Sequence, residues 1–87
     1  MAMTKKTVNI HSFVLTGDQI TGLNNKINEL TISGATDGYA VRTENAGVMT
    51  ITRDWLDQAA ADEWQLWVSA YVAQFGYSYS SMTVENI

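Results

Sequence analysis

Residues 57–76, DQAAADEWQLWVSAYVAQFG, carry more apolar surface at one spacing than any other stretch of the chain. Asp57 is suited to cap the start of a helix, and Gly76 is suited to the left-handed residue that ends one. A helix of this kind must lie on a sheet or against a partner. Its apolar positions recur at the 3.6-residue helical period: Ala60, Trp64, Trp67, Val68, Tyr71, Val72 and Phe75.

The segments before and after this helix predict strands. Residues 7–15 form a β-branched and aromatic run in which Asn9, His11, Phe13 and Leu15 share one face. Residues 77–84 predict the last strand of the chain. Its alternation slips at Ser80-Ser81, which indicates a β-bulge.

Two further strands are expected as a hairpin. Residues 39–44 and 48–53 both alternate between apolar and polar side chains. The segment Asn45-Ala46-Gly47 between them has the spacing of a three-residue turn, with glycine at the left-handed position. We therefore expect these two strands to pair antiparallel.

A second and weaker helix is predicted after the first strand. The segment Thr16-Gly17-Asp18-Gln19 has the form of a capping box, and an inward stripe of Ile20, Leu23, Ile27 and Leu30 follows it. The outer side of this helix is rich in asparagine, which favours helices poorly, so packing must hold it. Residues 31–38 contain two glycines and predict a connection.

The elements follow one another as β-α-β-β-α-β, which predicts an α+β, ferredoxin-like fold for residues 1–87 as a single domain. We expect a four-stranded antiparallel sheet in the order 4-1-3-2, with two helices on one face. The other face stays open. In this arrangement partners, ligands or a second sheet occupy the open face, so function depends on it.

Composition restricts the classes of partner. The net charge is −4 and the five Lys and Arg residues are scattered, so nucleic acid is not expected as a partner. No apolar stretch is long enough to span a membrane. A domain of 87 residues without cysteine has a small core and no disulfide, so we expect a homo-oligomer, in the cytoplasm or in a virion.

Few side chains suggest catalysis or metal binding. His11, the single histidine, is either a general base or a half-buried residue of the sheet, and no second motif supports a catalytic pair. The acidic residues Asp54, Asp57, Asp62 and Glu63 suit the negative first turns of a helix better than a metal site. We therefore predict no catalytic residue, no metal and no cofactor.

The aromatic residues are more numerous than a small sheet needs. Those of residues 57–76 pack on their own sheet or face another subunit. Trp55, just before them, is either a hydrophobic staple onto Ala61 or a residue at the rim of a contact. We define the interface set as the residues predicted to meet a partner protein: His11, Phe13, Trp55, Trp64, Trp67, Tyr71 and Phe75.

Residues 51–64, ITRDWLDQAAADEW, resemble the third strand and second helix of dimeric α+β barrel proteins, the class of the antibiotic-biosynthesis monooxygenase-like domains. That resemblance implies two ferredoxin-like chains packed sheet to sheet, with a substrate cavity between sheet and helices. Glu63 and Trp64 stand where many members carry a histidine. The same segment is also similar to small uncharacterised proteins of tailed bacteriophages.

Two functions remain open at this point. The first is a non-enzymatic interaction or structural subunit that self-associates or docks in a larger assembly, encoded by a phage. The second is a small dimeric α+β barrel enzyme or ligand-binding protein that acts on a small aromatic molecule. The second function requires a pocket lined by His11, Phe13, Met49 and Trp64.

Overall fold

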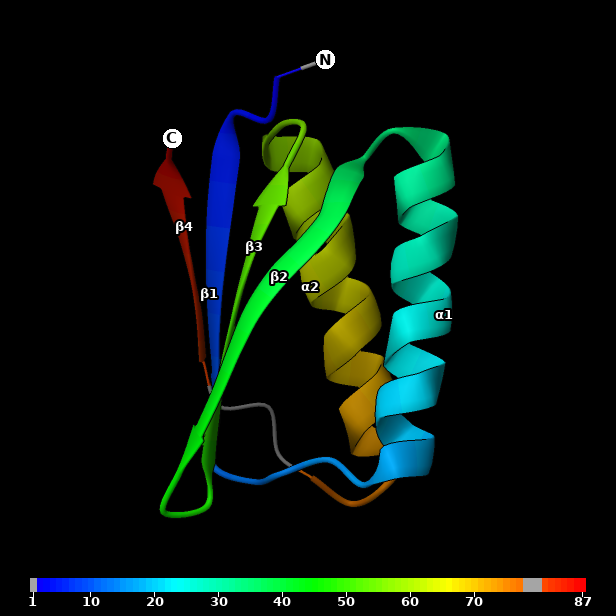
Figure 1. Cartoon of the computed structure of the whole chain (residues 1–87), viewed down its shortest axis with the longest axis vertical. Coiled ribbons are helices and arrows are strands. Elements are labelled where there is room, and N and C mark those ends of the chain that lie inside the picture. The colour runs from blue at the N-terminus through cyan, green and yellow to red at the C-terminus, as the bar shows by residue number, and fades with distance from the viewer. Residues whose placement is uncertain (1, 78–80) are drawn as a thin grey trace.

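One antiparallel sheet of four strands carries two helices on one of its faces (Figure 1). The computed structural model describes residues 2–77 and 81–87. Neighbouring strands follow the order β2-β3-β1-β4. The predicted α+β class, the four antiparallel strands and the two helices are thus confirmed. The elements are β1 (Lys5–His11), α1 (Gly17–Ser33), β2 (Thr36–Asn45), β3 (Val48–Trp55), α2 (Gln58–Ala73) and β4 (Ser81–Asn86).

Helix α1 begins at the predicted capping box. The amide of Gln19 donates to Thr16 Oγ1 at 3.4 Å, and the amide of Thr16 donates to Gln19 Oε1 at 2.9 Å. Both donors belong to the helix start and would otherwise lack a partner. The capping box is therefore formed as predicted.

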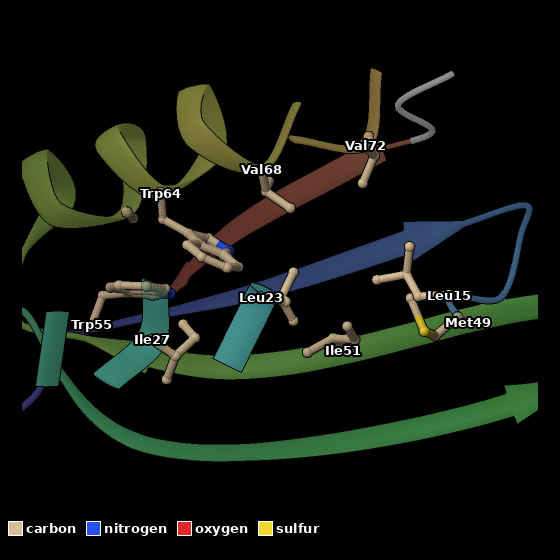
Figure 2. Packing of buried hydrophobic residues seen from close by; sticks show 10 residues of the cluster. Leu15, Leu23, Ile27, Met49, Ile51, Trp55, Trp64, Val68 and Val72 are labelled. Carbon is tan, nitrogen blue, oxygen red and sulfur yellow. The ribbon is translucent and has the colours of Figure 1, made fainter. Parts of the chain in front are cut away.

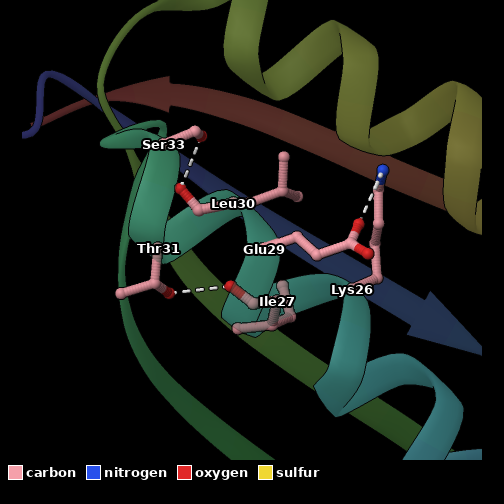
Figure 3. A network of polar contacts seen from close by, with 6 residues as sticks. All are labelled: Lys26, Ile27, Glu29, Leu30, Thr31 and Ser33. Atoms are coloured by element: carbon pink, nitrogen blue, oxygen red, sulfur yellow. Dashed lines mark hydrogen bonds and ion pairs between the residues drawn. The ribbon is translucent and has the colours of Figure 1, made fainter.

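The end of α1 lies three residues beyond the predicted one. The hydroxyl of Thr31 donates to the carbonyl of Ile27 at 2.7 Å, and that of Ser33 donates to the carbonyl of Leu30 at 2.9 Å (Figure 3). Gly34 then closes the helix with φ +86°. The prediction of a connection starting at residue 31 was wrong, because these hydroxyls bond back to the helix itself.

The β2–β3 hairpin turns in two residues and not in the predicted three. Asn45 pairs with Val48, so only Ala46 and Gly47 lie in the turn. Both have positive φ, +53° and +80°, as the tight type I′ turn requires. This turn type matches the right-handed twist of the two strands. It also places Ala46 in the left-handed region, which costs free energy because alanine has a Cβ.

Strand β2 also begins earlier than predicted, with an irregularity between Thr36 and Ala40. Gly38 has φ +78° at this point, and its amide donates to Thr36 Oγ1 at 3.3 Å. The Asp37 carboxylate accepts from the amide of Tyr39 at 2.9 Å. The bulge predicted at Ser80-Ser81 lies partly outside the described residues.

Strand β1 stops at His11, four residues before the predicted end. Leu15 is nevertheless buried, because the chain turns toward the helices after the strand. Helix α2 ends before Gln74, whereas Gly76, the predicted terminator, has φ +81° in the turn that follows. Strand β4 is described as Ser81–Asn86, and Tyr77, the predicted first residue of the last strand, is not in a strand. Residues 78–80 of the predicted strand lie outside the described residues.

The core lies between the sheet and the two helices (Figure 2). Trp55 of β3 stacks on Trp64 of α2 with ring centroids 5.4 Å apart, and its indole Nε1 donates to Thr7 Oγ1 of β1 at 2.8 Å. All three side chains are buried. The buried apolar residues are Leu15, Leu23, Ile27, Met49, Ile51, Trp55, Ala61, Trp64, Val68 and Val72.

Replacing Thr7 by Val tests this packing. The substitution leaves the buried indole N–H of Trp55 without its acceptor, which costs about 1–3 kcal/mol in free energy of unfolding. Urea denaturation measures the loss. Thr43→Val, the same change on an exposed residue of β2, should alter stability by less than about 0.5 kcal/mol. Equal effects of the two variants would contradict a role for this hydrogen bond.

Candidate functional site

The structure brings the whole interface set together in one series of neighbouring rings. Consecutive ring centroids are 4.3 to 6.4 Å apart, and Tyr77 completes the series. In spatial order the rings are Trp55, Trp64, Trp67, Tyr71, Phe75, Tyr77, Phe13 and His11. The set is therefore one spatial cluster, which runs from the core outward along α2.

Most of this series contacts its own chain. Trp55 and Trp64 are buried, and Trp67 and Tyr71 are half-buried. The Tyr71 hydroxyl donates to the carbonyl of Gln19 in α1 at 2.6 Å. Phe75, which is 40% exposed, is the residue of the interface set most accessible to a partner.

His11 is a core residue in this structure. Its side chain is only 2% exposed, on the helix-covered face of β1, and its ring lies 5.0 Å from that of Phe13. Burial lowers the pKa of His11 below its ordinary value of 6.5, so the ring is neutral at pH 7. The space lined by His11 and Trp64 is too small to hold a water molecule. The pocket required for a small aromatic substrate is closed at this position.

The lowered pKa of His11 makes stability depend on pH. The unfolded chain takes up a proton near pH 6.5 whereas the folded chain resists it, so stability falls as pH decreases through 6.5. The urea midpoint should therefore be lower at pH 5.5 than at pH 7.5. His11→Gln should flatten this dependence, because His11 is the single histidine. An unchanged pH dependence in that variant would count against burial of the ring.

The face of the sheet that carries no helix is the second candidate surface. Strand alternation and register place Val8, Ile10 and Val41 there, with Ile10 42% and Val41 51% exposed. We call this surface the open face. It consists of Lys6, Val8, Ile10, Val41, Thr43, Val48, Thr50, Thr52, Asp54, Ser81, Thr83 and Glu85.

The open face is β-branched at its centre and charged at one end. Val8 is paired with Thr52 on one side and Thr83 on the other. Lys6 is flanked in the same way by Asp54 and Glu85. The arrangement supplies apolar contact area and a local charge pattern, but no group suited to chemistry.

Arg53 was not among the residues predicted to form a site. It is 5% exposed and lies on the helix-covered face of β3, where its guanidinium carbon is 5.4 Å from the ring centroid of Trp64. Burial first, and the charge of Arg42 second, lower its pKa to about 10, so it is charged at pH 7. The signal was present in the sequence, since Arg53 alternates in phase with Met49 and Ile51.

Residues 2–77 and 81–87 contain neither a metal-binding cluster nor a helix suited to a membrane. Within those ranges no three His, Asp or Glu side chains gather closely enough to hold a metal ion. Neither α1 nor α2 has the length and apolarity that a membrane crossing by a helix requires.

Comparison with known proteins gives a fold and no function. No protein-family model matches the chain, and no curated protein is significantly similar to it. The crystal structure of a conserved protein from Methanosarcina mazei Go1 is similar to it, with a TM-score of 0.53 and 10% sequence identity. The match covers 98% of this chain and 91% of that one. At this identity the likeness concerns the fold alone.

Proposed function

We propose that this chain is a non-enzymatic interaction subunit with a ferredoxin-like fold, and that it self-associates through its open face. The observation that carries the proposal is the run of β-branched side chains that no helix covers, centred on Val8, Ile10 and Val41. Exposed apolar patches of this kind are typical of protein contacts. The assembly it serves is proposed to be a homodimer or a larger particle such as a virion.

The chemistry of the open face favours a second copy as its occupant. The face is a sheet surface of Val, Ile and Thr. A second surface of the same kind can pack on it, because side chains of similar size interdigitate between two sheets. In a dimer whose two-fold axis lies between the sheets and perpendicular to the strands, the charged end with Lys6, Asp54 and Glu85 lies over the uncharged end near Val48 of the other copy. No like charges then face one another.

The size of the face sets the strength of the contact. Four strands about 4.8 Å apart and about six residues long give a projected area on the order of 400 Å² per copy. Two copies bury about twice this area, which is at the low end for specific interfaces. We therefore expect a reversible dimer with a dissociation constant of about micromolar order.

Pairing through a sheet edge is less favourable for this chain. The β2 edge carries the irregularity at Gly38 and the ion pair of Arg42 with Glu44, at 3.7 Å. Irregular and charged edges discourage strand addition. The open face is therefore a better surface for a second copy than the β2 edge.

A second candidate function is a small ligand-binding protein of the dimeric α+β barrel type. A groove of about 710 Å³ between α1 and β2 favours it, since ligand sites commonly have this size. The same sheet-to-sheet dimer would serve this function. The second candidate therefore shares the dimer of the first and adds a ligand in the groove.

Sedimentation velocity at increasing concentration tests the proposed self-association. The chain should be mostly monomeric near about 0.1 µM and mostly dimeric near about 100 µM. Ile10→Lys places a charge at the centre of the open face and should keep the chain monomeric throughout. Leu66→Lys is the matched control on the outer side of α2, where Leu66 is 76% exposed, and should leave the dimer intact.

Two results would contradict this assignment. A wild-type chain that stays monomeric at about 100 µM has no self-association of the proposed strength. A dimer that survives Ile10→Lys and is lost in Leu66→Lys would place the contact on the outer side of α2.

A further inference from the structure

Arg53 is a buried cation without an anionic partner. None of the Asp and Glu side chains, all of which lie in the described residues, forms an ion pair with it. Its Nε is buried and makes no hydrogen bond to any described group. Taking a charge out of water costs several kcal/mol unless a partner compensates it. The ring of Trp64 offsets only part of this cost.

The unpartnered guanidinium borders the groove between α1 and β2. Arg42 lines the same groove from β2, and it is the diagonal neighbour of Arg53 because it pairs with Ile51. Asn24 and Asn28, one helical turn apart on α1, line the opposite side. The groove thus presents two guanidinium groups and two amides to its contents.

The charge around the groove is positive although the chain is acidic overall. The Asp54 carboxylate belongs to the open face, on the other side of the sheet from Arg53. Glu44 is the nearby carboxylate on the same strand as Arg42, and it pairs with Arg42 and not with Arg53. An anion in the groove would therefore meet an uncompensated charge at Arg53.

Part of the groove's accessible lining is apolar. Ile20 of α1 and Tyr39 and Ala40 of β2 contribute it, since Tyr39 is 72% exposed and the other two are half-buried. An inorganic anion would leave these side chains without contact, whereas a ligand with a hydrocarbon body would cover them. The lining therefore selects a ligand with one charged end and one apolar end.

We propose that the groove between α1 and β2 binds a small organic carboxylate, whose charged end pairs with Arg53 and whose apolar body lies on Ile20, Tyr39 and Ala40. The planar guanidinium suits a carboxylate because it can donate two parallel hydrogen bonds. Arg42 adds charge at the mouth of the groove, and the asparagine amides add donors. This site goes beyond the proposed self-association and lies on the opposite side of the sheet from it.

Titration with sodium octanoate, followed by isothermal calorimetry and by tryptophan fluorescence, tests the proposal. Octanoate should bind saturably with a dissociation constant on the order of 0.1–1 mM and alter the emission of Trp64. Arg53→Met should weaken binding at least about tenfold. Lys5→Met removes a cation outside the groove and should leave binding unchanged.

The thermal unfolding of the variants separates a binding role from a structural one. Arg53→Met should melt at the same temperature as the wild type or higher, because it removes an uncompensated buried charge. The rise in melting temperature that octanoate causes in the wild type should be absent in Arg53→Met. Should that variant fail to fold, Arg42→Met on the exposed rim should still weaken octanoate binding about threefold.

Four outcomes would overturn the carboxylate site. The first is the absence of saturable octanoate binding up to about 20 mM, which excludes an affinity of the expected order. The second is equal binding of the uncharged 1-octanol, and the third is octanoate binding undiminished in Arg53→Met. The fourth is tighter binding of inorganic phosphate than of octanoate, since the apolar lining would then contribute nothing.

Discussion

The stacking of Trp55 on Trp64 is the contact on which the rest of the structure depends. Trp55 ends β3, Trp64 belongs to the second turn of α2, and the indole N–H of Trp55 bonds to Thr7 of β1. One pair of rings thus joins both central strands to the helix that covers them. Aromatic side chains supply large buried areas, which a chain of 87 residues without disulfides needs.

Features set by neighbouring residues could be predicted from the sequence. The capping box at Thr16, the N-cap at Asp57 and the inward stripe of α1 involve groups within one or two turns of each other. The ends of helices and strands were harder to predict, because hydrogen bonds that extend an element compete there with those that end it. The hydroxyls of Thr31 and Ser33 extend α1, and the positive φ of Ala46 shortens the hairpin turn.

The fate of the aromatic residues could not be predicted, because periodicity identifies a stripe and not what covers it. Trp67 and Tyr71 lie toward α1, whose Gly22 leaves room for the Tyr71 hydroxyl; a Cβ at residue 22 would collide with it. That close approach depends on two residues far apart in sequence. Because of this close approach, Trp67 and Tyr71, which were predicted to meet a partner, contact α1 instead. Arg53 was not predicted as a site residue for a related reason. Strand alternation shows which face a side chain lies on, but it does not show whether an acidic side chain pairs with it.

Strand alternation makes the two proposed surfaces physically independent. On β2 and β3, successive side chains point to opposite sides of the sheet, so Val41 and Thr52 belong to the open face while Arg42 and Arg53 border the groove. A substitution at one surface leaves the side chains of the other in place. Retaining a cation at Arg53 is costly for a small core, and methionine would fill the same volume without that cost. The groove therefore requires an explanation of its own, which contact between two open faces does not supply.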